Sequence, residues 1–236
     1  MRLVAAYEFF RGEPELRLLK LLVPRNRIAL DVGANYGVYT YFLSRLVRHV
    51  YAFEPNLQLA DYLQRAVPGN VTVCRYGLSD HDGVACLRIP IIGGREIHGF
   101  GTVESYAFPS ATRTVEVALR RLDDQGLTEL GFIKIDVEGH EDAVLSGGEQ
   151  TIARWRPRMI IEIEQSFIPG AIRDRFARIA AMGYRLFYWR QNRLHEISTA
   201  NSASLSGESL LEVHNYICIP NEDQEMFNGF SAYFPA

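Results

Sequence analysis

The stretch FIKIDVEGHE, Phe132 to Glu141, ends in a cluster of titratable side chains around one glycine. Asp136, Glu138 and His140 are the members of this cluster that could perform proton-transfer chemistry. Histidine has an intrinsic pKa near neutrality and suits a general base, and a neighbouring carboxylate can orient it, bind an acceptor or steer a cation. We therefore take His140, Glu138 and Asp136 as candidate catalytic residues, and Asp136, which ends its strand, also as a cofactor-contacting residue.

A glycine turn lies earlier in the chain, in ALDVGANYGVYT, between an apolar run and a helical pattern. Gly33 and Gly37 allow a tight turn and a close approach of the backbone to a ligand. The first N–H groups of the following helix are free donors. Asp31 ends the apolar run and could accept hydrogen bonds from a cationic or hydroxylated ligand. This spacing predicts a ligand site at the carboxyl end of the first strand.

Glu54 ends the second apolar run, 21 residues after Gly33. In open α/β sheets an acid at the tip of the second strand, about 20 residues beyond the glycine turn, holds a ribose diol. The turn has neither GxGxxG spacing nor a Walker lysine, so a ligand with a ribose and no phosphate is favoured over a pyrophosphate. S-adenosylmethionine fits, with Asp31 and the glycine turn facing its amino-acid part. The alternative is that Gly33 and Gly37 only shape a turn and Glu54 is a solvated strand end.

The sequence GLSD, Gly77 to Asp80, follows the third apolar run. A small residue, a leucine and Ser-Asp can flank an adenine ring, with Ser79 or Asp80 near its exocyclic amine. Ser-Asp is also ordinary turn chemistry. The assignment of Ser79 and Asp80 to the cofactor therefore depends on the other strand ends.

Apolar runs alternate with helical patterns through most of the chain, which predicts a doubly wound, Rossmann-like α/β fold with a mainly parallel, seven-stranded sheet. The last two runs, YRLFYWRQNRLHEI and LEVHNYICIP, have no helix between them and predict an antiparallel C-terminal edge pair. The sequence predicts one domain over residues 1–236, and this domain begins with a helical segment over residues 1–26. Residues 91–109 are rich in glycine and predict a long irregular loop that covers the substrate.

Composition narrows the class of protein. The 236 residues suit one large α/β domain, and a net charge of −3 without a basic stripe argues against nucleic-acid binding. No stretch approaches about 18 apolar residues and no cleavable signal pattern is present, so we expect no transmembrane segment and a cytoplasmic location. Three widely spaced cysteines indicate neither a disulfide framework nor a zinc site. The sequence leaves a homodimer open.

In this order, DVGANYGVYT, FEPN, GLSD and FIKIDVEGHE resemble the FkbM-type S-adenosylmethionine-dependent methyltransferases, over roughly residues 13–164. The resemblance implies a class I methyltransferase domain with S-adenosylmethionine as methyl donor. It implies O-methylation of a small hydroxylated acceptor, usually a sugar, glycolipid or secondary metabolite. It places these residues on cofactor positions: Asp31, Gly33, Asn35, Gly37, Glu54 and Ser79. Tyr76-Gly77 departs from the family, whose members commonly carry a small Asn/Val-Ala pair there.

Three alternatives stay open. Asp136, Glu164 and Gln165 could supply oxygen ligands to Mg²⁺, so magnesium is an option and the metal is unknown. A nicotinamide-dependent oxidoreductase on a similar fold is disfavoured by the missing GxGxxG. A non-catalytic S-adenosylmethionine-binding protein is disfavoured by the polar cluster around His140.

Some polar residues near this cluster have simpler structural explanations. Lys134 lies in the middle of a strand, and we expect it to be paired with Glu162 or Glu164. His98, within residues 91–109, is a candidate for the acceptor site, but a solvated loop histidine is the preferred interpretation.

The helix EDAVL offers a structural explanation for three more residues. His140 could help to cap this helix. Glu141 and Asp142 suit the positive N-terminal end of the helix, and we expect no catalytic duty from them.

Overall fold

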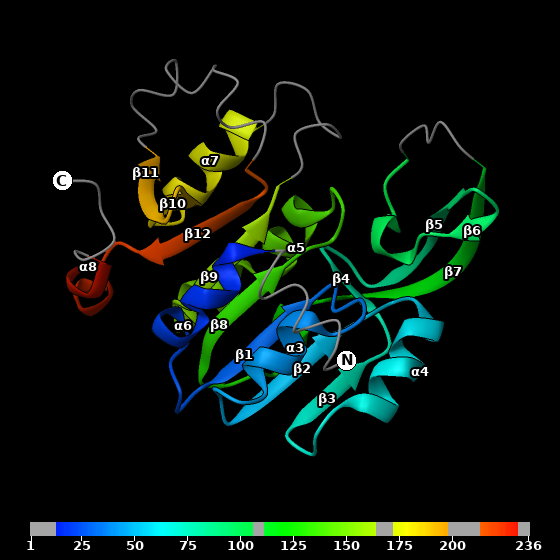
Figure 1. Cartoon of the computed structure of the whole chain (residues 1–236), viewed down its shortest axis with the longest axis horizontal. Helices are drawn as coiled ribbons and strands as arrows, with labels where there is room; N and C mark the ends of the chain where they lie inside the picture. Colours follow the sequence, from blue (N-terminus) through cyan, green and yellow to red (C-terminus); the bar gives the residue numbers. More distant parts are fainter. Residues whose placement is uncertain (1–12, 106–110, 164–171, 198–212, 231–236) are drawn as a thin grey trace.

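The computed structural model describes residues 13–105, 111–163, 172–197 and 213–230. These residues form an α/β structure with one eight-stranded sheet and one four-stranded sheet. Figure 1 shows the large sheet with its helices, and the longer strands of the small sheet extending to one side. The predicted α/β class is therefore confirmed, whereas a second sheet was not predicted.

The large sheet is mainly parallel. Its strands in spatial order are β11 (Arg193–Ile197), β10 (Tyr184–Arg190), β12 (Asn215–Pro220), β9 (Arg158–Glu162), β8 (Leu130–Ile135), β1 (Ile28–Val32), β2 (His49–Phe53) and β3 (Val71–Cys74). The pairings β2–β3, β1–β2, β1–β8 and β8–β9 are parallel. The pairings β9–β12, β12–β10 and β10–β11 are antiparallel. The prediction of seven strands with one antiparallel edge pair was thus wrong by one strand.

The extra strand comes from a tight turn inside YRLFYWRQNRLHEI. Gln191 and Asn192 both have positive φ, +52° and +61°, and they separate β10 from β11 by two residues. Two consecutive residues with positive φ form the kind of turn whose twist suits a hairpin. Because the segment lacks the usual Asn-Gly signal of such a turn, its sequence predicts one long strand.

The small sheet holds the segments that follow β3. Its order is β4 (Gly77–Ser79), β7 (Thr112–Arg121), β5 (Gly83–Ile92) and β6 (Arg95–Glu96). Strands β5 and β7 form a long antiparallel ladder with a small core of Leu87, Ile89 and Val117. They alternate buried and exposed residues, as a half-exposed antiparallel pair should.

The predicted irregular loop over residues 91–109 is partly regular. It contains the end of β5, the short strand β6 and a 3₁₀ helix, η2 (His98–Phe100). The prediction of an irregular segment was wrong over this part, because short β6 pairs with the end of β5. Residues 106–110 lie outside the described residues.

The helices follow the predicted alternation with strands. They are η1 (Pro14–Leu18), α2 (Leu19–Leu22), α3 (Val38–Leu43), α4 (Leu57–Ala66), η3 (Asp123–Gln125), α5 (Glu141–Gly147), α6 (Glu149–Trp155), α7 (Ile172–Ala181) and α8 (Gln224–Phe230). Asn56 caps α4 by accepting a hydrogen bond from the Gln58 N–H. In the part of the chain that the structure describes, no helix has the length and apolar character needed to cross a bilayer.

Two cores cover the two faces of the large sheet. In β1, Ile28, Leu30 and Val32 pack with residues of α5, α6 and α7 on one face, while Ala29 packs with α2, α3 and α8 on the other. The period of two along a strand produces this division. In β8, Phe132 packs into the second core, and Lys134 therefore points to a covered face as well.

Gly147 lets helix α5 approach β4 closely. A Cβ atom built at this position would lie 1.8 Å from the carbonyl oxygen of Ser79. No side-chain rearrangement relieves this contact, because the obstructing atom belongs to the backbone. The packing of α5 against β4 thus depends on the absence of a side chain.

We expect Gly147→Ala to lower the free energy of unfolding by about 2 kcal/mol or more, because the helix must shift away from the strand. Gly69→Ala is the matched control, since a Cβ there meets nothing within 4 Å. Urea unfolding of both variants measures the difference. Equal stability of the two variants would contradict the packing described for α5.

Candidate functional site

A cavity of about 660 Å³ lies where the carboxyl ends of β1, β2 and β8 face the small sheet. We call it the carboxyl-end cavity. Its lining residues are Val32, Gly33, Asn35, Glu54, Pro55, Asn56, Gly77, Leu78, Leu87, His98, Gly99, Gly101, Val103, Leu119, Asp136, Val137, Glu138 and His140. Both sheets therefore contribute to one hollow, which is where open α/β sheets bind ligands.

The glycine turn forms one wall of this cavity. Gly33 has φ +82°, and a Cβ there would lie 1.8 Å from the carbonyl oxygen of Asp136. Gly37 has φ +80° and occupies the N-cap position of α3. Asn35 has φ +49°, and its buried side-chain oxygen has no hydrogen-bond partner among the described residues. The turn thus brings the backbone of β1 against that of β8 and presents a free acceptor.

Glu54 is held rigidly at the end of β2. Its carboxylate accepts hydrogen bonds from the Asn35 N–H at 2.7 Å and from the Asn56 N–H at 2.8 Å. Burial raises the pKa of Glu54 to about 7, against the opposing effect of the two N–H groups. Each carboxylate oxygen keeps a free lone pair, so Glu54 can still accept from two ligand hydroxyls.

A second cavity, also of about 660 Å³, lies beside the first. It is lined by Glu13, Asp31, Gly33, Ala34, Asn35, Tyr36, Val38, Tyr39 and Asp136. We call it the acidic cavity, because it includes three carboxylates and no Lys, Arg or His among these residues. The two cavities share Gly33, Asn35 and Asp136, so one elongated ligand could extend through both.

Asp31 is buried within β1, where its carboxylate accepts a hydrogen bond from the Thr40 hydroxyl. Burial raises the pKa of Asp31 to about 6, and the bond from Thr40 opposes this shift. Asp31 thus lines the acidic cavity from a fixed position. It lies beside Lys134 in the parallel register of β1 and β8.

Lys134 is fully buried and paired. Its Nζ lies 2.9 Å from the Asn215 side-chain oxygen and 3.5 Å from carboxylate oxygens of both Asp136 and Glu162. Burial alone would lower the pKa of Lys134, but the two carboxylates outweigh it and raise the pKa. The expected pairing with Glu162 is confirmed, while Glu164 lies outside the described residues.

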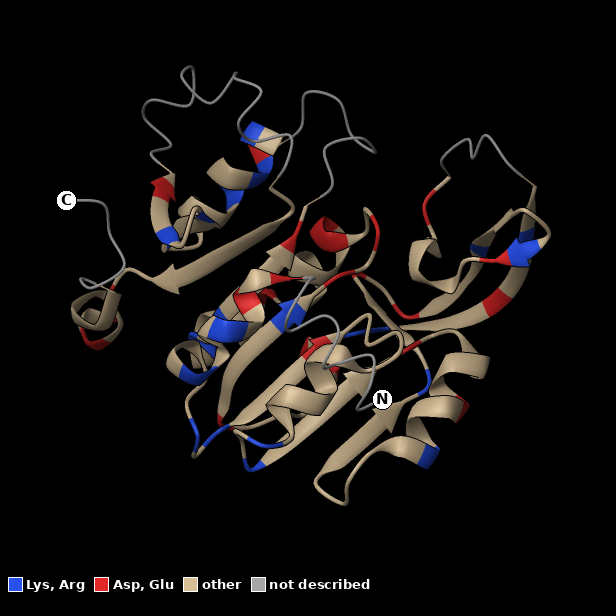
Figure 2. Ribbon diagram, viewed as in Figure 1, with Lys and Arg blue, Asp and Glu red and all other residues tan. Residues whose placement is uncertain are grey.

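Glu162 and Asp136 face the same ammonium from neighbouring strands. Burial raises the pKa of Glu162, and the adjacent carboxylate of Asp136 raises it further. The Asp136 and Glu162 side chains are 29% and 27% exposed, so both reach the open side of the sheet. Figure 2 shows acidic positions gathered around the carboxyl ends of the central strands.

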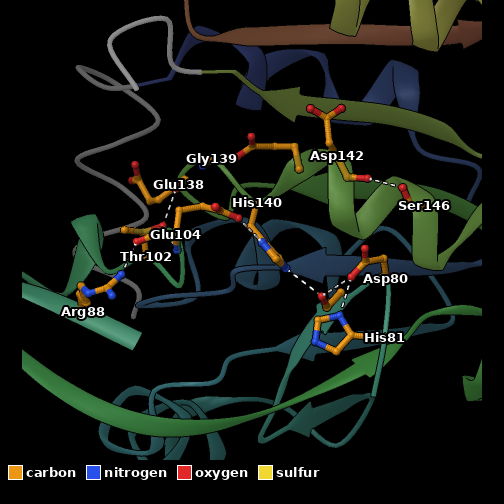
Figure 3. A network of polar contacts seen from close by, with 12 residues as sticks. Asp80, His81, Arg88, Thr102, Glu104, Glu138, Gly139, His140, Asp142 and Ser146 are labelled. Atoms are coloured by element: carbon orange, nitrogen blue, oxygen red, sulfur yellow. Dashed lines mark hydrogen bonds and ion pairs between the residues drawn. The ribbon is translucent and has the colours of Figure 1, made fainter. Parts of the chain in front are cut away.

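His140 joins the two sheets (Figure 3). Its Nδ1 lies 2.6 Å from a carboxylate oxygen of Glu104, and its Nε2 lies 2.9 Å from the hydroxyl of Ser79. His140 occupies the N-cap position of α5 and its carbonyl oxygen accepts from the Val144 N–H, but its side chain makes no capping hydrogen bond. Both ring nitrogens are thus engaged with neighbours, while the ring still lines the carboxyl-end cavity.

Glu138 lies in the same loop and has φ +51°. Its carbonyl oxygen accepts a 2.7 Å hydrogen bond from the Thr102 hydroxyl, which also accepts from the Glu104 N–H (Figure 3). The segment around Thr102 and Glu104 is therefore fastened to the loop after β8 at two points, Glu138 and His140.

The two candidate adenine contacts are not in the cavity lining. Ser79 is fully buried and bonds to His140, and Asp80 pairs with His81 on the surface. Gly77 and Leu78 line the cavity instead. The two residues of GLSD that line the cavity are therefore not the two that the sequence assigned to the cofactor, and that assignment stays a prediction.

Glu141 and Asp142 have a structural role in the first turn of α5. Arg175 of α7 donates to both carboxylates at 2.8 Å, and the Glu141 carboxylate also accepts from the Gly139 N–H. Burial raises the pKa of Glu141, and the Arg175 guanidinium opposes this. These contacts anchor the loop that carries His140.

Two residues that line the cavities were not assigned to the site from the sequence. His98 was expected in solvent, but it lines the carboxyl-end cavity and its Nδ1 lies 3.0 Å from the Asn56 side-chain nitrogen. Glu13 lines the acidic cavity and accepts a 2.6 Å hydrogen bond from the Tyr39 hydroxyl. No local sequence pattern indicates that either residue belongs to the site, because both come close to the strand ends only in the folded chain.

The magnesium alternative is untested, because Glu164 and Gln165 lie outside the described residues. Within the described ranges, no group of three His, Cys, Asp or Glu side chains is arranged to hold a metal ion. Beside Asp136 the cation is the ammonium of Lys134. We therefore assign no metal ligand.

The raised pKa values of Glu54 and Asp31 predict that the free energy of unfolding falls as pH rises from about 5 to about 8. A carboxyl whose pKa is higher in the folded state contributes stability below its unfolded pKa, and this contribution is lost as pH rises through the folded pKa. For Glu54, with a pKa moving from 4.5 to about 7, the loss is at most about 3 kcal/mol.

Urea unfolding at the two pH values measures this effect in the protein and in Glu54→Gln. The variant should lose less stability over the interval. Glu129→Gln, which alters an exposed partner of Arg48, is the control and should keep the original dependence. The same dependence in Glu54→Gln as in the unchanged protein would contradict the assignment.

Comparisons with known proteins place this chain in a family. The methyltransferase FkbM domain matches residues 31–186. The hexuronic acid methyltransferase AglP of Haloferax volcanii is 31% identical over 147 residues, which cover 58% of this chain and 56% of AglP. The 31-O-demethyl-FK506 methyltransferase FkbM of Streptomyces tacrolimicus is 27% identical over 191 residues, which cover 66% of this chain and 72% of that protein.

Two solved structures are also similar. The methyltransferase FkbM of Methylobacillus flagellatus has a TM-score of 0.42 and 21% identity, over 58% of this chain and 32% of that chain. A Streptococcus mutans protein, SMU.1697c, in complex with S-adenosylhomocysteine has a TM-score of 0.47 and 14% identity, over 87% of this chain and 94% of that chain. Because the family match spans more than half of its length, the chain belongs to the methyltransferase FkbM family.

Proposed function

We propose that this protein is an S-adenosylmethionine-dependent methyltransferase that methylates a hydroxyl group of a small acceptor. The observation that carries the proposal is the pair of cavities that meet at Gly33 and Asp136. One cavity offers an acid held for a ribose, and the other offers carboxylates for a cationic amino-acid end. Membership of the methyltransferase FkbM family supports the same chemistry.

The residues present fit the proposed cofactor. Glu54 has free lone pairs for ribose hydroxyls, and the unpartnered oxygen of Asn35 can accept from a polar group of the ligand. Gly33 lines both cavities without a side chain that would occupy them, and Gly37 lies at the N-cap of α3 beside the turn. Asp31 and Asp136 lie beside the positively charged part.

At the adenine end, Gly77 and Leu78 line the proposed position of the ring. We propose that Ser79 acts there through His140, to which it is bonded, rather than by touching the ring. Asp80 stays a candidate for the exocyclic amine, although its side chain is 52% exposed and pairs with His81.

When bound, S-adenosylmethionine supplies an activated methyl group on a sulfonium centre. Asp136 lies at the junction of the two cavities, and the proposed role of its carboxylate is electrostatic. Glu138 and His140 line the neighbouring wall, where a hydroxyl could be oriented and its proton received. The segment from His98 to Val103 lines the same cavity, which supports a covering role for residues 91–109.

The name of one relative favours oxygen as the methyl acceptor, because the Streptomyces protein is named for 31-O-demethyl-FK506. AglP is named for a hexuronic acid, which supports a sugar-like acceptor. Because this chain aligns with only 56% of AglP, the proposed acceptor class rests on the site as well as on the relatives. A hydroxyl on a sugar, a glycolipid or a secondary metabolite is the proposed target.

The two rival functions have less support. A nicotinamide-dependent oxidoreductase would need a pyrophosphate at the turn, where Asn35 and Tyr36 stand in place of the glycine pattern. A non-catalytic cofactor-binding protein would not need Asp136, Glu138 and His140 around the junction of the cavities.

Calorimetry tests the cofactor. We expect binding of S-adenosylhomocysteine and no binding of NAD⁺. Glu54→Gln should weaken S-adenosylhomocysteine binding by about tenfold or more, because a charged acceptor of the ribose hydroxyls is lost. Asp61→Asn, on the exposed face of α4, is the control and should bind normally. Tighter binding of NAD⁺ would favour the oxidoreductase.

Transfer of a radiolabelled methyl group to a panel of sugars, glycosides and macrolides tests the activity. We expect Asp136→Asn to reduce the rate by about a hundredfold and His140→Ala or Glu138→Ala by at least tenfold, in keeping with lost electrostatic and proton-transfer contributions. Full activity of all three variants on the acceptor would overturn the assigned roles.

A further inference from the structure

The acidic cavity carries a net negative charge. Glu13, Asp31 and Asp136 line it, and Glu162 lies 3.5 Å from the Lys134 ammonium, as Asp136 does. Three to four carboxyl groups therefore surround one buried cation. Even with Glu162 protonated, as its raised pKa favours, the three carboxylates that line the cavity outnumber the ammonium.

Lys134 cannot neutralise a ligand in this cavity. Its side chain is 0% exposed and its ammonium is occupied by Asn215, Asp136 and Glu162. The ring of Tyr39, which lines the cavity, has its centre 5.0 Å from Nζ. The Tyr39 hydroxyl donates to the Glu13 carboxylate, which lines the same cavity. A ligand thus meets the carboxylates, while the ammonium stays behind them.

The sequence limits the other sources of positive charge. Residues 106–110, 164–171, 198–212 and 231–236 contain neither Lys nor Arg. Residues 1–12 contain only Arg2 and Arg11. Among the described residues, the acidic cavity is lined by no basic side chain.

We propose that the acidic cavity selects ligands that carry positive charge. It binds the methyl donor, with its cationic sulfonium, more tightly than the product, whose thioether is uncharged. It also disfavours an acceptor that carries a carboxylate at its reacting ring. The inference rests on the proposed function and narrows its acceptor to neutral or cationic hydroxyl compounds. Asp136 carries most of the selectivity, because it borders both cavities at the expected position of the sulfur. Glu162 strengthens this preference for positive charge, because it shares the Lys134 ammonium with Asp136.

The charge balance of the reaction agrees with this arrangement. The acceptor oxygen forms a bond to the methyl carbon, and the electron pair of the carbon–sulfur bond stays on sulfur. The sulfonium charge disappears, and the hydroxyl proton passes to a carboxylate of the site. The attraction between the cavity and the ligand therefore weakens once transfer is complete, which favours release of the product.

Calorimetry with three probes tests the proposal. S-adenosylmethionine carries the sulfonium, sinefungin carries an amine at the same position, and S-adenosylhomocysteine carries no charge there. We expect both cations to bind about tenfold more tightly than S-adenosylhomocysteine, since a unit charge near a carboxylate at a partly buried site is attracted by more than a kilocalorie per mole. These measurements need no variant.

Variants locate the selectivity. Asp136→Asn should reduce the preference for both cations to about threefold or less, and Glu162→Gln should reduce it by a smaller factor. Thermal melts of both variants show whether they fold. Glu129→Gln, an exposed acid outside both cavities, is the control and should keep the full preference.

The outcomes separate this inference from the proposed function. If S-adenosylhomocysteine binds as tightly as both cations, the charge selection is wrong, although a methyltransferase stands. An unchanged preference in folded Asp136→Asn and Glu162→Gln also overturns it, and so does methylation of a hexuronide ahead of its matched hexoside. If none of the three probes binds, the proposed function itself fails.

Discussion

The burial of one ammonium organises this molecule. Lys134 has no exposed surface, and a buried charge without partners costs several kcal/mol. Its partners come from three strands, because Asp136 follows β8, Glu162 ends β9 and Asn215 begins β12. The register pairs Asn215 with Glu162, so the antiparallel strand β12 must end up beside β9 for the lysine to be satisfied.

The same constraint explains why FIKIDVEGHE resembles a half-exposed strand. Its charged positions alternate with isoleucines, yet all six residues of β8 are buried. Ile133 and Ile135 pack on one face, and Lys134 meets polar partners on the other. A period of two normally indicates water on one side. Here it indicates a polar pocket at the carboxyl end of a covered sheet.

The parts of the fold that local pattern encodes could be predicted, and these include the α/β class, the alternation of strands with helices and the pairing of Lys134. The predictions failed where long-range pairing decides. The turn at Gln191 lacks a hairpin signal, and the small sheet forms because β5 meets β7 across 21 intervening residues or more. The cavity residues His98 and Glu13 were not assigned to the site for the same reason.

The small sheet gives the site its second wall. A large sheet alone leaves the carboxyl ends of its strands open to water, but His140 reaches Glu104 and Ser79, and the Thr102 hydroxyl reaches the loop after β8. These bonds join segments that lie 36 to 61 residues apart. Exclusion of water strengthens every electrostatic interaction inside the hollow. The engagement of His140 with both sheets therefore links the closure of the site to the strength of its carboxylates.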